Sequence, residues 1–229
     1  MKNEKFIKEG SSSFSVYEPK IIRDQINCLC KLFPELVFIN KKFVDKKLPQ
    51  DAEGWFVVPR WRSIASTYDK AIEKVFDLMR TMQNRRLNIV YAGQMESQYL
   101  KPRQGHVKAS KVLEKNQNGD FLFIPAQFGV KPISYPSEDE LMNLNVNEFG
   151  LGIFEVSIMI LTHPERFLHE DNLPVWCIGD EYSKLGNGEF LLTPFFRFKH
   201  KQLEINMWTM DDIYQAPFSE VGIATGFIV

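Results

Sequence analysis

Residues 66–79 read STYDKAIEKVFDLM, and their pattern sets the first constraint on the fold. The apolar side chains recur with helical spacing on one face, while the charged residues between them fall on the other. Either Ser66 or Thr67 can cap the N-terminus of such a helix. We therefore predict an amphipathic helix over about 66–84 that covers a hydrophobic core with Tyr68, Ala71, Ile72, Val75, Phe76 and Met79.

Two other stretches predict helices that pack on the same core. Residues 20–33 keep helical apolar spacing, and residues 149–161 are the most apolar stretch of the chain, although they contain Glu155. The second stretch would span about 20 Å as a helix, which is too short to cross a bilayer. We expect it to be a buried helix, with Gly150 and Gly152 letting its start pack closely against a neighbour.

Short apolar runs predict strands, most of them in the last third of the chain. Residues 195–199 and 202–208 are expected to form a hairpin through His200 and Lys201. The polar stretch 93–119 predicts only a short helix, at about 107–113, and another short helix is expected to begin at 137–140. The remaining strands are expected at 36–39, 55–58, 87–91, 121–124, 175–178, 190–192 and 223–229.

These elements do not alternate regularly along the chain, which disfavours a doubly wound parallel sheet. We predict an α+β fold with a mixed or antiparallel sheet covered by about three main helices. The polar residues 1–18 are expected to be a flexible arm, and residues 19–229 a single globular domain without an internal linker. Nineteen Phe among 229 residues supply a large core without disulfides or metal.

Charge and cysteine content narrow the class of protein. With 28 Lys and Arg against 29 Asp and Glu, the net charge is −1, whereas dedicated nucleic-acid binders are usually basic. The three cysteines, Cys28, Cys30 and Cys177, make a poor disulfide framework. We expect free thiols, a cytoplasmic location and no association with a membrane.

No motif fixes a reaction or a cofactor. The chain has no Gly-x-Ser-x-Gly elbow, and Gly150-Leu-Gly152 lacks the third glycine of a dinucleotide-binding loop. His163 and His169 are six residues apart, which is not a spacing that places two ligands on one helix face. The sequence therefore predicts no metal site and names no cofactor.

Asp180 and Glu181 are the first candidate catalytic residues. They follow the predicted strand 175–178 through Gly179, at a strand end where acids and bases often lie. The alternative is a solvated turn, and adjacent side chains normally point apart, which disfavours a shared proton.

A second candidate is an anion-binding site where the predicted strand 55–58 leads into the predicted helix 66–84. Arginine side chains, hydroxyls and free helix amides are all donors for a phosphate or carboxylate. The alternative is that the arginines flank a packed Trp61 and pair with surface carboxylates. The residues that would form the site are Arg60, Arg62, Ser63, Ser66 and Thr67.

A third candidate is a basic run that would bind nucleic acid through Lys101, Arg103, Lys108 and Lys111. Nearby tyrosines could stack on bases. The alternative is a solvated loop and helix face, as most charge runs are.

Three functions remain open at this point. The first is a non-catalytic binding or interaction protein whose partner is a small anion or another protein. The second is a hydrolase or transferase that acts on a substrate bearing phosphate or carboxylate. The third, a nucleic-acid accessory protein, is possible but not favoured by the net charge.

Overall fold

The amphipathic stretch forms helix α3, whose apolar face is buried as predicted. The computed structural model describes residues 17–36, 46–82, 86–134, 144–209, 212 and 220–229. Along the chain the elements are α1 (Ile22–Leu32), β1 (Gly54–Pro59), α2 (Trp61–Ile64), α3 (Tyr68–Thr81), β2 (Leu87–Ile89), β3 (Leu100–Pro102), α4 (Gln104–Asn116), β4 (Phe121–Phe128), β5 (Ile133–Ser134), β6 (Glu148–Gly150), α6 (Ile153–Thr162), η3 (Pro164–Phe167), β7 (Val175–Trp176), β8 (Asp180–Tyr182), β9 (Thr193–Lys199), β10 (Gln202–Trp208) and β11 (Glu220–Phe227).

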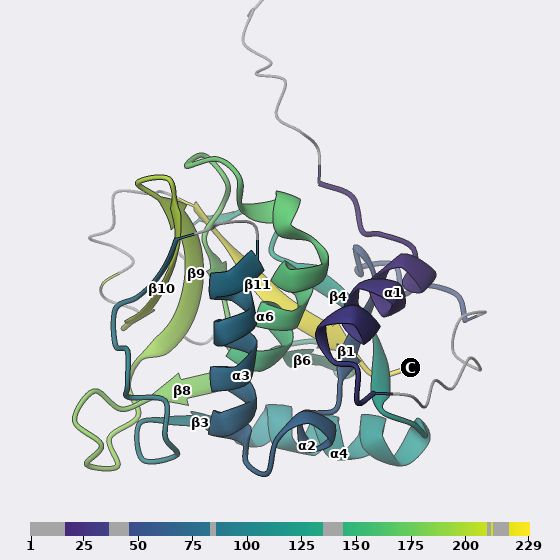
Figure 1. Cartoon of the computed structure of the whole chain (residues 1–229), viewed down its shortest axis with the longest axis horizontal. Coiled ribbons are helices and arrows are strands. Elements are labelled where there is room, and N and C mark those ends of the chain that lie inside the picture. The colour runs from purple at the N-terminus through teal and green to yellow at the C-terminus, as the bar shows by residue number, and fades with distance from the viewer. Residues whose placement is uncertain (1–16, 37–45, 83–85, 135–143, 210–211, 213–219) are drawn as a thin grey trace, which may run out of the picture.

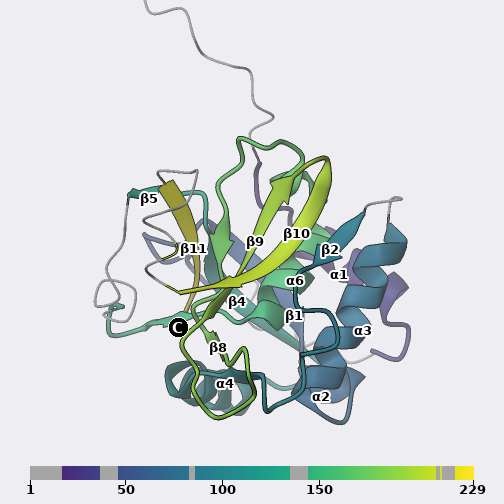
Figure 2. The ribbon, with the colours of Figure 1, turned by 90° about the vertical axis from the view of Figure 1, so that its left-hand side faces the viewer.

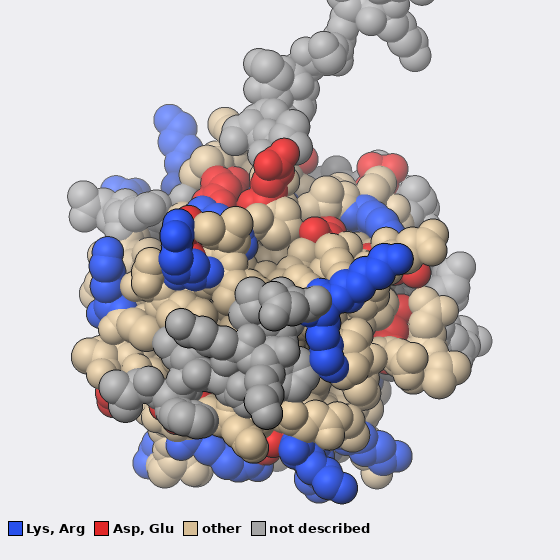
Figure 3. All heavy atoms as spheres, turned by 90° about the vertical axis from the view of Figure 1, so that its right-hand side faces the viewer, with Lys and Arg blue, Asp and Glu red and all other residues tan. Residues whose placement is uncertain are grey.

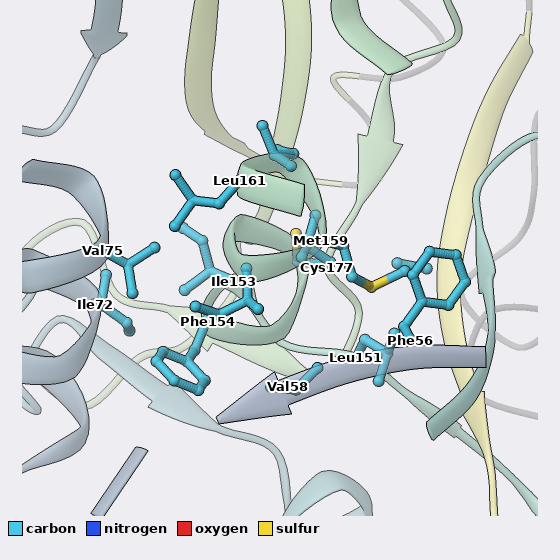
Figure 4. Packing of buried hydrophobic residues seen from close by; sticks show 14 of the residues in the cluster. Phe56, Val58, Ile72, Val75, Leu151, Ile153, Phe154, Met159, Leu161 and Cys177 are labelled. Carbon is cyan, nitrogen blue, oxygen red and sulfur yellow. The ribbon is translucent and has the colours of Figure 1, made fainter. Parts of the chain in front are cut away.

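Helix α6 lies at the centre of the molecule. All ten of its residues are buried, which suits a helix that is apolar on every side. It lies between the sheet and the outer helices α1 and α3 (Figure 1). In Figure 4, Ile153 and Phe154 lie between Ile72 and Val75 of α3 and Val58 of β1. The prediction of a buried helix is confirmed, although the helix begins after β6 rather than at Phe149.

The main sheet is mixed, as predicted. Its strands run in the order β1-β4-β11-β7-β9-β10-β2, and β5 and β6 also pair with β11 (Figure 2). The pairs β7–β11 and β2–β10 are parallel and the others are antiparallel. Because the helices pack on this one sheet around a continuous core, the fold is a single α+β domain.

The predicted hairpin is present as β9 and β10, which pair from Thr193 with Trp208 to Lys199 with Gln202. Its two turn residues, His200 and Lys201, have φ of 53° and 58°. Two consecutive residues with positive φ define the tight turn whose twist matches the strands that it joins.

Several elements differ from the sequence prediction, α4 and β8 among them. Helix α4 has 13 residues instead of about seven, and it adds a fourth long helix to the three expected. Its buried face is carried by His106, Ala109 and Leu113, which is too small an apolar stripe to be recognised. Strand β8 occupies the position expected to be a turn, whereas residues 190–192 contribute only a bridge between Leu192 and Tyr182.

Some predictions concern residues outside the described ranges. These residues are 37–39 of the predicted strand at 36–39, the start of the predicted helix at 137–140, and 1–16 of the predicted arm. Tyr17, at the end of the predicted arm, packs edge-on against Phe128 and His163. Cys28, Cys30 and Cys177 form no disulfide with one another, and burial raises the pKa of the Cys177 thiol. No helix in the described ranges is long and apolar enough to cross a bilayer.

Gln25 completes the outer edge of β1. Its side-chain amide donates to the Trp55 carbonyl at 2.8 Å and accepts from the Val57 amide at 2.9 Å. Replacing Gln25 with alanine would leave both buried backbone groups without a partner. We expect the free energy of unfolding to fall by about 2–3 kcal/mol in urea denaturation. Arg23→Ala, on the exposed side of the same helix, is the control, and an equal small loss in both variants would contradict this role.

Candidate functional site

His106 lies in the first turn of α4, buried between two carboxylates. Its Nε2 is 3.3 Å from Glu155 Oε1, and its Nδ1 is 3.6 Å from Asp180 Oδ1, just beyond hydrogen-bond distance. The ring also stacks on Phe149, with centroids 6.3 Å apart. We call His106, Glu155, Asp180 and Tyr68 the histidine cluster.

The N-terminus of α6 holds the two carboxylates in place. Asp180 accepts the Ile153 amide at 2.7 Å and the Tyr68 hydroxyl at 3.0 Å, and Glu155 accepts the Gly152 amide at 3.1 Å. These amides belong to the first turn, where backbone donors have no helical partner and the helix dipole favours negative charge. The cluster thus joins α3, α4, α6 and β8.

Glycines allow this close approach. A Cβ on Gly152 would lie 2.6 Å from the Tyr68 hydroxyl oxygen and 2.7 Å from an Asp180 carboxylate oxygen. A Cβ on Gly179 would lie 2.4 Å from the Gly150 carbonyl oxygen. The prediction that Gly150 and Gly152 let the helix start pack against a neighbour is confirmed, and that neighbour is the β7–β8 connection.

The charges in the cluster are strongly coupled. Burial acts to lower the pKa of His106, but the negative charge of Glu155 and the contact with Asp180 outweigh it and raise this pKa to about 10. Burial acts to raise the pKa of Glu155, and the imidazolium of His106 more than reverses that effect. Burial, and then the charges of Asp180 and Glu155, raise the pKa of Tyr68. His106 is therefore an imidazolium at neutral pH.

In this charge state His106 is better suited to holding structural elements together, a role that we call the clamp, than to carrying a proton. A general acid or base works best when its pKa is near the working pH. His106 holds its proton well above neutral pH, and the Tyr68 hydroxyl already donates to Asp180. What the cluster does is fix α4 against α6 and β8, and so shape the surfaces on both sides of α4.

Two buried histidines with opposite pKa shifts predict a stability maximum near pH 6.5. His163 has its pKa lowered to about 4 by burial and then by Lys20, whose backbone amide donates to its Nε2. Below pH ~6.5 the unfolded chain binds more protons at His163 than the folded chain does, so the free energy of unfolding falls as the pH falls. Above pH ~6.5 the unfolded chain binds fewer protons at His106 than the folded chain does, so the free energy of unfolding falls as the pH rises. Denaturation at pH 5, 6.5 and 8.5 should therefore give the largest free energy of unfolding at pH 6.5. A steady rise to pH 8.5 would contradict the shift at His106.

The first surface beside α4 is a cleft of about 410 Å³, which we call the large cleft. It lies between α4, β6, the β7–β8 connection and the chain end near Ile228. Four of its polar residues are Arg103, His106, Lys108 and Glu148. Its apolar walls include Ala109, Val112, Leu144, Phe149, Ile178 and Ile228.

A smaller cleft, of about 100 Å³, lies on the other side of His106. We call it the small cleft. Trp61, Arg62 and Tyr68 line it, together with Lys111 of α4 and Glu155 at the histidine cluster. His106 is thus the residue that separates the two clefts and lines both.

The structure separates the two adjacent acids predicted as catalytic. Asp180 is fully buried in the histidine cluster, rather than in a solvated turn. Glu181 points the other way, and its carboxylate lies 3.2 Å from Lys101 Nζ and 3.4 Å from Arg103. The expectation that the two side chains point apart agrees with this geometry.

The five residues predicted to bind an anion do not share one cleft. The Arg60 guanidinium donates to the backbone carbonyls of Glu114, Gln117 and Gly119. Arg62 pairs with the Glu114 carboxylate at 2.9 Å, and its guanidinium lies 4.1 Å from the Trp61 ring centroid.

The hydroxyl residues of that prediction are also apart. Ser63 donates to Asp120 at 3.4 Å, and Ser66 and Thr67 are exposed between α2 and α3. Of the five, only Arg62 lines the small cleft. These contacts give no support to an anion site built from all five residues.

The predicted basic run is divided as well. Lys101 and Arg103 pair with Glu181, and Lys101 Nζ lies 3.7 Å from the Phe190 ring centroid. Lys108 lines the large cleft and Lys111 the small one. Among the described residues, no group of three His, Cys, Asp or Glu side chains is placed to hold a metal.

Sequence reasoning missed Tyr68, His106 and Glu155 as site residues. Tyr68 looked like part of an apolar stripe and His106 like part of a basic run. Glu155 did leave a signal, because it is the single charged residue in the apolar stretch 149–161. A lone carboxylate in a buried helix requires a partner, and in the structure that partner is His106.

Comparisons with models of protein families, with curated proteins and with solved structures found no match for this chain. Function therefore has to be inferred from the two clefts and the charges around them.

Proposed function

We propose that the protein binds a small amphipathic molecule with an anionic group, a carboxylate or a phosphate, in the large cleft. The supporting observation is the cleft itself, which combines apolar walls with Lys108 at its edge. Its volume of about 410 Å³ lies in the range typical of small-molecule sites, which are mostly apolar with a few polar groups that orient the ligand.

The walls of the large cleft are held in place without a ligand. The histidine cluster fixes α4, and β6 is paired with β11. The β7–β8 connection is tied to the start of α4 by the Arg103 amide, which donates to the Gly179 carbonyl at 2.8 Å. A preformed cleft favours binding because little conformational entropy is lost when the ligand enters.

Lys108 is the cation best placed for the anionic group. Arg103 also lines the cleft, but it contacts Glu181, the Asp180 carbonyl and the Thr193 hydroxyl. Lys108 is exposed and has no ion pair or hydrogen bond with another described residue. An incoming anion would therefore gain a charge contact without breaking one.

A hydrolase or transferase that uses the small cleft is the second candidate. Arg62 and Lys111 could orient an anionic substrate there, beside Glu155. Turnover of p-nitrophenyl phosphate or p-nitrophenyl acetate that is lost in Glu155→Gln and kept in Glu73→Gln, a change at an exposed residue that lines neither cleft, would favour this activity. The coupling of Glu155 to His106 and the high pKa of His106 favour binding instead.

Nucleic-acid binding stays the third candidate. Figure 3 shows Lys and Arg side chains at several places on one face, including its lower edge, the end where α2 and α4 lie in Figures 1 and 2, with acidic groups among them. Two of the four predicted contacts, Lys101 and Arg103, already pair with Glu181. Binding to nucleic acid would have to show a steep decrease in affinity with salt to support this function.

Titration of the ¹⁵N-labelled protein with octanoate and with phenyl phosphate tests the proposed function. We expect shifts of the Ala109, Gly150 and Gly179 amide signals, which report on three walls of the large cleft. Val112→Trp should fill the cleft and weaken binding at least about tenfold, because Val112 lines it and is partly exposed.

Lys115→Ala is the matched control, since Lys115 is an exposed lysine of α4 that lines neither cleft. It should leave both titrations unchanged. Binding that Val112→Trp does not weaken, or no shift of cleft amides with either probe at millimolar concentration, would overturn the proposed function.

A further inference from the structure

The large cleft carries one unpaired charge of each sign. Arg103 is balanced by Glu181, and His106 is balanced by Glu155 and Asp180. Lys108 and Glu148 remain, and they form no ion pair with each other or with another described residue. They stand on different elements, α4 and β6, and both line the cleft.

Glu148 is positioned by neutral groups. Its Oε1 accepts the Thr225 hydroxyl at 2.6 Å, and its Oε2 accepts the Asn145 side-chain amide at 2.9 Å. Pairing of Glu148 with Phe227 of β11 fixes the backbone beneath it. Two neutral donors orient the carboxylate but do not cancel its charge, and a carboxylate has room for further donors.

Most of the other residues that line the cleft are apolar. Phe149, Ile178 and Ala109 are buried residues of the wall, and Val112 and Ile228 extend it toward the surface. A ligand that fits this set of residues has an apolar part, one anionic group and one cationic group. A simple carboxylate or phosphate would leave Glu148 without a cationic partner and in repulsion with the ligand's own charge.

From this charge pattern we infer that the ligand of the large cleft is a zwitterion, an α-amino acid with an apolar side chain. Its carboxylate contacts Lys108, its ammonium group contacts Glu148, and its side chain lies against Phe149 and Ile178. This inference rests on the proposed function and adds the cationic group to the ligand. Both charges of the ligand are then matched, and neither replaces an existing ion pair.

Calorimetric titration with three probes of similar size tests which charges of the ligand contribute to binding. L-Phenylalanine has both charges, hydrocinnamate lacks the ammonium group and phenethylamine lacks the carboxylate. Because each missing charge removes one charge-assisted contact, we expect phenylalanine to bind at least about tenfold more tightly than either analogue.

Two variants test which residue contacts each charged group of the ligand. Glu148→Gln keeps the shape of the side chain, and it should weaken phenylalanine about tenfold while leaving hydrocinnamate unchanged or tighter. Lys108→Ala should weaken phenylalanine and hydrocinnamate alike. Lys115→Ala should change neither, and unchanged thermal melting shows that each variant is folded.

The outcomes distinguish this inference from the proposed function. If hydrocinnamate binds as tightly as phenylalanine and Glu148→Gln has no effect, the zwitterion is excluded while binding of an anion in the cleft stands. If Val112→Trp weakens neither probe, or neither binds at millimolar concentration, both the zwitterion and the proposed function are overturned.

Discussion

Replacing His106 with alanine is expected to lower the free energy of unfolding by about 3–5 kcal/mol, the usual cost of breaking a buried ion pair by removing one partner. The variant leaves Glu155 and Asp180 buried near one another without the cation between them. It also removes the ring that stacks on Phe149. Urea denaturation at pH 6.5 measures the effect.

Lys111→Ala is the control for His106→Ala, because it removes an exposed cation from the same helix. It should change the free energy of unfolding by less than about 0.5 kcal/mol. Adding Glu155→Gln to His106→Ala should recover part of the loss, since one of the two unpaired carboxylates becomes neutral. A loss below ~1 kcal/mol for His106→Ala alone would mean that the clamp does not hold α4.

Phe76→Ala is the second large expected effect, again about 3–5 kcal/mol. Phe76 is 2% exposed on the buried face of α3, which packs against α6. Deleting the ring removes its transfer free energy and leaves a cavity that rigid neighbours on both helices cannot fill. Glu73→Ala, on the exposed face of the same helix, should be nearly neutral, and equal effects in the two variants would mean that α3 docks through another face.

The elements that the sequence predicted well are those with a strong local pattern. The stripe of α3, the apolar stretch of α6 and the two neighbouring runs of β9 and β10 each determine their own structure within about 16 residues. Helix α4 was underestimated because a histidine and an alanine occupy two of its three buried positions. Strand β8 was taken for a turn because one of its two buried residues, Asp180, is a carboxylate.

The candidate site could not be predicted in the same way. Tyr68 and Asp180 are in direct contact but 112 residues apart in sequence, and the other members come from two further helices. No local pattern reports on such contacts, because strand order and helix packing bring them together. Of the predicted residues, Asp180 belongs to the histidine cluster and Lys108 lines the large cleft. Arg60 and Glu181 have partners elsewhere.

The role of His106 has a direct consequence for the clefts. Both are bounded by α4, and His106 is the α4 residue whose charge ties that helix to α6 and β8. If the imidazolium holds α4 in place, the walls of the large cleft exist before any ligand arrives.

The ¹⁵N chemical shifts of the His106 ring, followed from pH 5 to pH 10.5, test this clamp most directly. We expect both ring nitrogens to stay protonated through pH 8.5, with a titration midpoint near pH 10. The other buried histidine, His163, serves as an internal comparison and should be neutral over the same range. A midpoint for His106 at or below ~6.5, the ordinary value, would show that it is not an imidazolium between two carboxylates and would contradict the clamp.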